Sequence, residues 1–328
     1  VDPGTNGNVT VCENAAALDL FSQLGGTPEA GGSWTGPSNA PHPATFTPGV
    51  DPGGVYTYTV AGSGACGSSS ATSAVTVVVE TVPDAGSNGA ITVCSTDGIQ
   101  DLFGALGGSP QPGGTWTGPG SGSAIGAYDP ASDPPGVYTY TVLGAAPCPN
   151  ATATVTVTLN VPPSAGVDGS ITLCSSDAPA SLFDQLGGAP DAGGSWSGPS
   201  VVSGGMIDPA TMSGGVYTYT VAGLAPCPDE SATVTVTINT PPDPGTDGAI
   251  TLCTSDAAIA LIGQLGGTPD PGGSWSGPSA VSGALFDPAT MSAGVYTYTV
   301  AGTAPCPDES ATVTVTLNVP PSAGVDGS

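Results

Sequence analysis

The eight cysteines have the most definite chemistry in this sequence, because they recur in pairs at a nearly constant spacing. The two members of successive pairs stand 54, 54, 53 and 53 residues apart. A zinc site is the alternative, but the chain has no Cys-x-x-Cys motif and a single histidine. We therefore expect the two cysteines of each pair to form one disulfide inside each copy of a repeated segment, in an oxidising compartment. The expected pairs are Cys12 with Cys66, Cys94 with Cys148, Cys174 with Cys227, and Cys253 with Cys306.

His42 is the only candidate for a catalytic general base, and it lies between two prolines. A Ser-His-Asp arrangement needs one histidine at each site. One histidine cannot serve four copies of a repeat, so we expect no enzyme activity.

Aspartates that recur along the chain could hold calcium, which takes about six to eight oxygen ligands. Asp247 has no neighbouring carboxylate, and Asn6 or Asn88 stands at its position in the first two copies. Turn formation by Asp-Gly and Asp-Pro is therefore the expected role, with no cofactor, and calcium remains the alternative. The candidate ligands are Asp168, Asp177, Asp208, Asp243, Asp247 and Asp287.

Tryptophan and tyrosine also recur once or more in each unit, and they could stack on sugars or fill a core. Each Trp stands between small polar residues, which would point outward if the Trp pointed inward. We therefore expect core packing, with an aromatic binding surface as the alternative. The expected core aromatics are Trp34, Trp116, Trp196, Trp275, Tyr58, Tyr140, Tyr219 and Tyr298.

All these residues belong to one segment of about eighty residues that is repeated four times. The first cysteine of each copy recurs at steps of 82, 80 and 79 residues. Residues 153–170 are identical to residues 311–328, so we expect the chain to be a segment of a longer array. The predicted domains are 1–82, 83–161, 162–240 and 241–319, and 320–328 begins a fifth repeat.

The third repeat illustrates the elements that must position these residues. Residues 216–221 and 232–238 alternate Val or Tyr with Thr, which predicts two strands of a hairpin. Shorter strands are expected at 170–174 and 194–198, and a short helix at 179–186. The predicted fold class is all-β: a tandem array of four small Ig-like antiparallel β-sandwich domains, each with one short helix and one disulfide.

Charge limits the possible partners, because the chain has 26 Asp and Glu and neither Lys nor Arg. Nothing in it can neutralise phosphates, which excludes nucleic acid. Anionic membranes are disfavoured for the same reason. No run approaches the 18 apolar residues of a spanning helix, so direct membrane insertion is not expected.

The recurring motifs are Leu-Gly-Gly, Gly-Gly-x-Trp-Ser/Thr-Gly-Pro, Gly-Val-Tyr-Thr-Tyr-Thr-Val and Ala-Pro-Cys-Pro. With these motifs the chain resembles the Ig-like/PKD-like tandem repeats of large secreted surface adhesins of Bacteroidetes type, which are associated with gliding motility and type IX secretion. The resemblance covers all four repeats. It implies an extracellular or cell-surface location and supplies no catalytic residues.

Two functions fit these features. The first is a non-catalytic structural segment of an extracellular adhesin stalk or surface filament, whose partners are further copies of the same repeat in a longer chain. Unpaired Thr- and Val-rich edge strands also allow lateral self-association. The alternative is a carbohydrate- or surface-ligand-binding module that acts by avidity.

Overall fold

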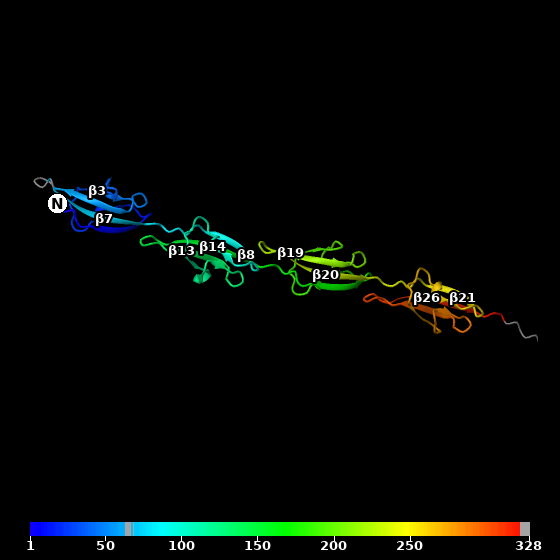
Figure 1. Cartoon of the computed structure of the whole chain (residues 1–328). Coiled ribbons are helices and arrows are strands. Elements are labelled where there is room, and N and C mark those ends of the chain that lie inside the picture. Colours follow the sequence, from blue (N-terminus) through cyan, green and yellow to red (C-terminus); the bar gives the residue numbers. More distant parts are fainter. Residues whose placement is uncertain (63–66, 68, 322–328) are drawn as a thin grey trace, which may run out of the picture. The chain divides into compact units, whose positions relative to one another are not determined.

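The computed structural model describes residues 1–62, 67 and 69–321, and almost all of its regular structure is β-strand (Figure 1). The chain divides into two compact units. The first unit comprises Val1–Pro162 together with Leu224–Cys227, a loop tip of the third repeat. The second comprises Pro163–Gly223 and Pro228–Ser328.

In the first repeat the main sheet has the order β1-β7-β6-β3-β4. Its strands are β1 (Gly7–Cys12), β7 (Ser70–Glu80), β6 (Gly54–Ala61), β3 (Ser33–Thr35) and β4 (Pro41–His42). β1 runs parallel to β7, and the other pairs are antiparallel. The ribbon β2 (Leu18–Asp19) with β5 (Thr45–Phe46) forms the second, smaller layer.

The second repeat has the same design, with the main sheet β11-β10-β13-β14-β8 and the ribbon β12-β9. The main strands are β8 (Gly89–Cys94), β10 (Thr115–Thr117), β11 (Ser123–Ala124), β13 (Gly136–Val142) and β14 (Ala151–Asn160). The ribbon strands are β9 (Gln100–Asp101) and β12 (Ala127–Tyr128).

The second unit holds two four-stranded versions of this sheet. The third repeat contains β15 (Gly169–Cys174), β17 (Ser195–Ser197), β19 (Gly215–Val221) and β20 (Glu230–Asn239), with the ribbon β16 (Ala180–Ser181) and β18 (Met206–Ile207). The fourth contains β21 (Gly248–Cys253), β23 (Ser274–Ser276), β25 (Gly294–Val300) and β26 (Glu309–Asn318), with β22 (Ile259–Ala260) and β24 (Leu285–Phe286). The predicted fold class, four Ig-like β-sandwich domains in tandem, is confirmed. The parallel pairing of each first strand with the last strand departs from the antiparallel expectation.

The short helix expected at 179–186 is only one 3₁₀ turn, η4 (Phe183–Gln185). Leu186 already has an extended backbone, and Gly187 pairs with Val167 in a β-bridge, so a second helical turn has no room. Its counterparts are η1 (Phe21–Gln23) and η5 (Leu261–Gln264). The second repeat places its 3₁₀ turn elsewhere, at η3 (Pro119–Ser121).

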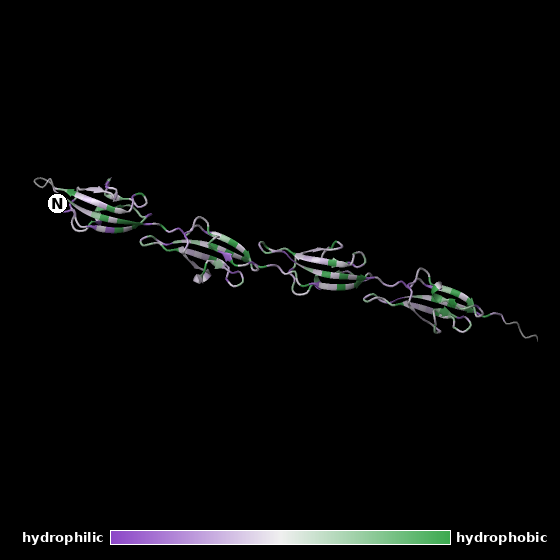
Figure 2. Ribbon diagram, in the orientation of Figure 1, coloured by the Kyte–Doolittle hydropathy of each residue, from purple (hydrophilic) through white to green (hydrophobic). Residues whose placement is uncertain are grey.

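The core of each repeat follows from the strict alternation along the hairpin strands. In β19, Tyr217, Tyr219 and Val221 are buried, whereas Thr218 and Thr220 lie on the opposite, half-exposed face. Figure 2 shows this as alternating apolar and pale bands along the long strands. Burial of the apolar face is the main stabilising contribution to each small sandwich.

The inner tyrosine of each hairpin strand also holds the loop before the Trp strand. The Tyr219 hydroxyl donates to the Asp191 carbonyl at 2.7 Å and accepts from the Gly194 N–H at 2.8 Å. A Cβ on Gly194 would lie 2.6 Å from both the Thr220 carbonyl oxygen and the Tyr219 ring, so this close approach requires glycine. The other repeats have the same contacts from Tyr58, Tyr140 and Tyr298.

Candidate functional site: the disulfide joints

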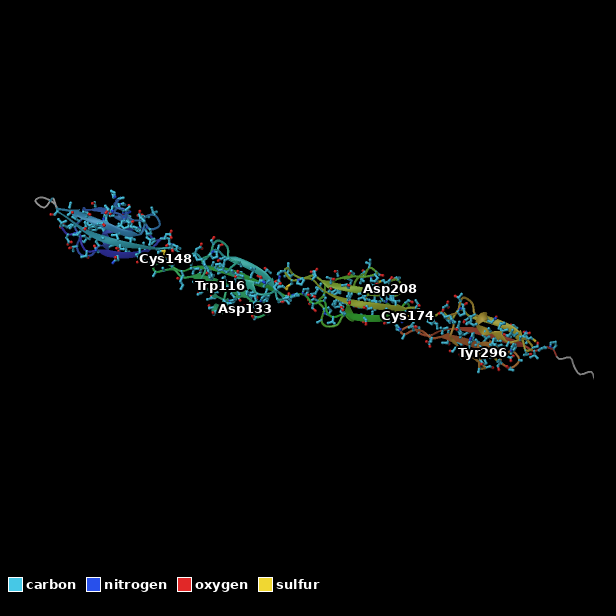
Figure 3. The ribbon with its side chains drawn as sticks, in the orientation of Figure 1. Trp116, Asp133, Cys148, Cys174, Asp208 and Tyr296 are labelled. Atoms are coloured by element: carbon cyan, nitrogen blue, oxygen red, sulfur yellow. A yellow bond between two sulfur atoms is a disulfide. The ribbon has the colours of Figure 1, made fainter. Side chains whose placement is uncertain are left out.

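The disulfides connect different repeats, and the expected pairing within each repeat is wrong. Each observed bond joins the cysteine at the end of a first strand to the loop cysteine of the next repeat. The Cα atoms of the bonded pairs are 4.9, 5.0 and 4.9 Å apart. Figure 3 labels Cys148 and Cys174, one member of the first and of the third pair. The pairs are Cys12 with Cys148, Cys94 with Cys227, and Cys174 with Cys306.

The parallel first strand explains why a repeat cannot close its own disulfide. Cys94, at the end of β8, lies opposite Asn160, the last residue of β14. Cys148 is in the loop that enters β14 at its other end, Ala151. The nine residue steps from Ala151 to Asn160 correspond to about 30 Å of strand. A disulfide tolerates a Cα separation of at most about 7 Å.

The joint between the third and fourth repeats has polar contacts beside its disulfide. The Asn239 side-chain amide donates to the Ala304 carbonyl at 2.7 Å and to the Thr303 carbonyl at 3.4 Å. These carbonyls belong to the loop that carries Cys306, and the Ala304–Pro305 peptide bond in it is cis. The amide therefore holds the incoming loop next to the sulfur of Cys174.

Asn160 makes the equivalent contacts in the first unit, to the carbonyls of Leu224 at 3.3 Å and Ala225 at 2.8 Å. The first joint differs, because Glu80 replaces the asparagine opposite Cys12. A carboxylate has no N–H to donate. As at the Cys306 joint, the sulfur of Cys148 lies 3.4 Å from a carbonyl oxygen, that of Glu80, but among the described residues no side-chain amide donates to the loop.

Cys66 lies outside the described residues. Cys253 is half-buried and has no disulfide partner among residues 1–62, 67 and 69–321. It has the strand-end position of Cys174, since it pairs in register with Asn318 as Cys174 pairs with Asn239. The Asp256 carboxylate accepts the Cys253 N–H at 2.6 Å, as Asp177 does for Cys174 at 2.7 Å.

The tryptophans lie against the inner tyrosines, with ring centroids 5.0 to 5.1 Å apart in all four repeats. Trp34 and Trp116 are 5% and 9% exposed, whereas Trp196 and Trp275 are half-buried. Grooves of about 420 and 510 Å³ lie beside Trp34 and Trp196. In the groove of the third repeat, the polar side-chain groups are the Ser195 hydroxyl, the Trp196 indole N–H and the Tyr219 hydroxyl, and the last already bonds the loop.

The candidate calcium ligands hold turns and strand ends. Asp168 and Asp247 accept the N–H groups of Thr233 and Thr312, each at 2.7 Å. The other carboxylates accept N–H groups two or three residues away. In the part of the chain that the structure describes, no three His, Cys, Asp or Glu side chains form a group that could hold a metal.

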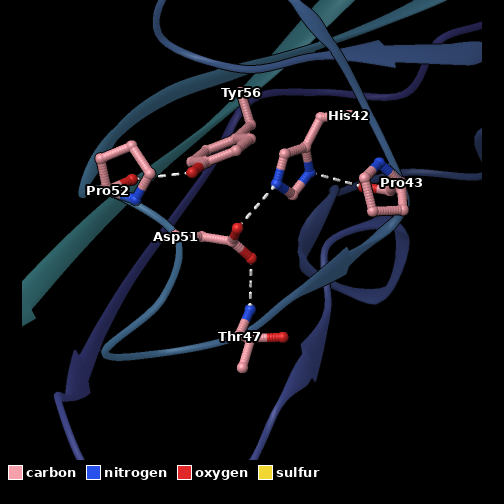
Figure 4. A network of polar contacts seen from close by, with 6 residues as sticks. All are labelled: His42, Pro43, Thr47, Asp51, Pro52 and Tyr56. Atoms are coloured by element: carbon pink, nitrogen blue, oxygen red, sulfur yellow. Dashed lines mark hydrogen bonds and ion pairs between the residues drawn. The ribbon is translucent and has the colours of Figure 1, made fainter.

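His42 is bonded on both sides (Figure 4). Its Nε2 lies 3.3 Å from Asp51 Oδ1, and its Nδ1 lies 2.7 Å from the Pro43 carbonyl oxygen. The other Asp51 oxygen accepts the Thr47 N–H at 2.7 Å. The two oxygens that contact the ring nitrogens belong to a carboxylate and a peptide carbonyl. Neither group is a hydroxyl or thiol from which a general base could take a proton.

No family model and no curated protein matches this chain. Among solved structures, an I-band fragment of titin is 14% identical over 72% of this chain and 97% of its own, with a TM-score of 0.41. Immunoglobulin domains 1–5 of Sidekick-1 are 13% identical over 96% of this chain and 80% of their own, with a TM-score of 0.31. The insect immune protein hemolin is 14% identical over 96% of this chain and 98% of its own, with a TM-score of 0.29. Similarity at this level assigns no function.

Among the described residues, the chain contains no helix long and apolar enough to cross a membrane.

Proposed function

We propose that this chain is a non-catalytic segment of an extracellular stalk or filament, in which shared disulfides join neighbouring Ig-like repeats. The observation that carries the proposal is the pairing of each first-strand cysteine with the loop cysteine of the next repeat. Each pairing adds a second covalent connection to the backbone linker. A connection of this kind stabilises the joint between repeats, which is what a stalk requires and a set of independent binding modules does not.

The disulfides and the repeat resemblance support the location and the class. Stable disulfides form in oxidising, extracytoplasmic compartments. The resemblance to Bacteroidetes-type surface adhesins adds the cell surface and an adhesin stalk to the proposal. The domain boundaries 1–82, 83–161, 162–240 and 241–319 belong to the same proposal, with one structural repeat in each.

Peptide mapping under non-reducing conditions and small-angle scattering together test the stalk. Trypsin has no cleavage site here, so pepsin at low pH, where disulfides do not exchange, is the suitable protease. We expect peptides that link Cys12 to Cys148, Cys94 to Cys227 and Cys174 to Cys306. The double variant Cys174→Ser/Cys306→Ser should keep the wild-type circular dichroism but scatter as a more flexible particle. Disulfides within repeats, or unchanged scattering, would contradict the proposal.

We further propose that Cys253 and Asn318 accept the Pro-Cys-Pro loop of another repeat, as their counterparts do at the other joints. Two thiols become one disulfide while glutathione disulfide is reduced to two glutathione molecules. The probe is a synthetic Gly-Leu-Ala-Pro-Cys-Pro-Asp peptide in a glutathione buffer. We expect it to couple to Cys253 several-fold faster than a scrambled peptide, and Asn318→Ala should remove the difference. Equal rates for the two peptides would overturn this assignment.

Carbohydrate or surface-ligand binding is the second candidate, because Trp196 is half-buried beside a groove. The scarcity of free polar side chains there weakens it, since sugar recognition needs oriented hydrogen-bonding groups. A glycan array separates the two functions: binding that is lost in Trp196→Ala would support the groove, and an array without signal would leave the stalk.

A further inference from the structure

We propose that the staggered disulfides make this array an extension limiter, in which pulling force bypasses the bodies of the repeats. The body of a repeat is defined here as the chain between its first-strand cysteine and its loop cysteine. The tail runs from the loop cysteine of one repeat to the first-strand cysteine of the next, for example Cys148 to Cys174 (Figure 3).

The covalent connectivity determines the route that becomes taut first. From Cys12 the route crosses a disulfide to Cys148, follows the chain for 26 residue steps to Cys174, and crosses a second disulfide to Cys306. The backbone alone covers 294 residue steps between Cys12 and Cys306. Every residue in between that lies off the short route is enclosed in a disulfide-closed ring, so unfolding it releases no length to the pulled ends.

The difference in length is large. At about 3.4 Å per residue, the backbone between Cys12 and Cys306 would extend to about 1,000 Å, but the tail only to about 90 Å. The two disulfides add Cα–Cα spans of only 4.9 Å each. The oxidised array is therefore about tenfold less extensible than its sequence length implies.

The tail itself has little slack, because most of it is already strand. It contains β14 and β15, whose residues have extended backbone, and a linker with two consecutive prolines, Pro162 and Pro163. Extended strand already spans about 3.3 Å per residue, close to the limit of the chain.

The force-carrying strand is also the best anchored strand in its sheet. β14 pairs antiparallel with β13 on one side and parallel with β8 on the other. Pulling along β14 loads these ladders in shear, so many hydrogen bonds resist together instead of opening one by one. The short strands β10 and β11 and the ribbon β9–β12 lie in the body, outside the force route.

Reduction would switch the limiter off. A dithiol reductant gives two electrons to each disulfide, leaves two cysteine thiols, and becomes a cyclic disulfide itself. The route then reverts to the backbone. The limiter depends only on the disulfide connectivity and is independent of the surface that the array serves.

Single-molecule force spectroscopy on the whole chain, pulled from its two ends, tests the limiter. We expect the distance between Cys12 and Cys306 to reach at most about 100 Å in the oxidised chain and about 1,000 Å in the reduced chain. A fully oxidised wild-type chain that extends to the reduced length would overturn the proposal.

Two double variants make the test specific, because removal of different disulfides has unequal consequences. Cys94→Ser/Cys227→Ser leaves the 26-step route intact, so its limit should equal that of the wild type. In Cys174→Ser/Cys306→Ser the shortest route crosses the first disulfide to Cys148 and follows the chain back for 54 steps to Cys94. It then crosses the second disulfide to Cys227 and follows the chain for 79 steps to residue 306, which gives 133 steps in total. The greatest distance between residues 12 and 306 in this variant should therefore rise to about 450 Å.

Equal lengthening of the two variants would show that the disulfides act only as local staples and would overturn the proposal. If either variant fails to fold, stepwise reduction of the wild type gives the same comparison. Peptide mapping done in parallel separates a wrong disulfide pattern from a wrong force route.

Discussion

At the residue scale, the two tyrosine hydroxyls on the first strand of each hairpin hydrogen-bond to the backbone of neighbouring loops and hold those loops in place. Tyr219 makes two hydrogen bonds across the repeat, to Asp191 and Gly194. Tyr217 makes one, by donating to the Ser213 carbonyl at 2.6 Å. Because the two side chains share one strand and are equally buried, they form a matched pair for measuring these bonds.

Tyr219→Phe should destabilise the third repeat by about 1–3 kcal/mol, since it removes two hydrogen bonds of about 0.5–1.5 kcal/mol each, those to the half-buried Gly194 N–H and the Asp191 carbonyl. Tyr217→Phe, which loses a single donor, should cost about 1 kcal/mol. Hydrogen exchange followed by mass spectrometry measures both, with the loss of protection in Tyr219→Phe centred on residues 191–194. Equal effects of the two substitutions would count against the loop-holding role.

Tyrosine ionisation should make the second repeat sensitive to alkali. Burial, and secondarily the Asp133 carboxylate, raises the pKa of Tyr138 above its ordinary value. The folded state therefore keeps a proton that the unfolded chain releases. Stability should be unaffected below about pH 10 and should fall as the pH rises through the folded-state pKa.

Asp133→Asn should lower the pKa of Tyr138 back toward its ordinary value, because it removes the charge but keeps the burial. Absorbance at 295 nm during an alkaline titration sums the nine tyrosines, so the part of the curve that Tyr138→Phe removes reports the Tyr138 phenolate. An unchanged titration curve in Asp133→Asn would show that the carboxylate has no part in the shift.

At the element scale, the strands could be predicted and their pairing only in part. The alternation of Tyr or Val with Thr was sufficient for the hairpin strands, but it does not distinguish the buried Trp34 and Trp116 from the half-buried Trp196 and Trp275. The helix was overestimated because the spacing of Leu182 and Leu186 fits one turn as well as two. The disulfide pairing depends on whether β8 runs parallel or antiparallel to β14, and the spacing of Cys94 and Cys148 carries no information about strand direction.

The joint contacts were also beyond the reach of the sequence, although a signal was present. Asn160 and Asn239 end their strands at equivalent positions, where the first repeat has Glu80. The role of these residues becomes visible only when the loop of the next repeat is in place.

Asn239→Asp should weaken the joint, because its carboxylate cannot donate to the Thr303 and Ala304 carbonyls and repels them instead. We expect the Cys174–Cys306 disulfide to be reduced about tenfold more readily, a change of about 1.4 kcal/mol that fits the loss of two exposed hydrogen bonds. Thiol labelling at graded dithiothreitol concentrations measures it. Glu80→Asn should act in the opposite direction on Cys12–Cys148, and a shift of the same sign in both variants would contradict the assigned role of the amide.

At the scale of the whole molecule, the net charge of −26 has almost no internal compensation. Among the described residues, the Val1 amino group lies 3.9 Å from the Glu29 carboxylate, and His42 Nε2 lies 3.3 Å from Asp51, a contact that is an ion pair only when the imidazole is protonated. Chains of this charge repel one another, and at 0.1 M salt the repulsion between charges more than about 10 Å apart is largely screened.

Lateral self-association should therefore increase with salt. The outer first strands, such as β15, leave one edge unpaired in the sheet order and could pair between chains. Sedimentation velocity at about 0.01 and 0.5 M salt should show monomers in the first and larger species in the second. Association that is stronger at low salt would exclude edge pairing between like-charged chains.

The sharing of each disulfide between two repeats also affects how the gene can change. Every repeat contributes one first-strand cysteine and one loop cysteine, so removal of a whole repeat simply presents Cys12 with the loop cysteine of the next copy. Loss of a single cysteine instead leaves a thiol in the neighbouring repeat without its partner. Unequal recombination between identical stretches, such as 153–170 and 311–328, can therefore lengthen or shorten the array while every internal joint stays closed.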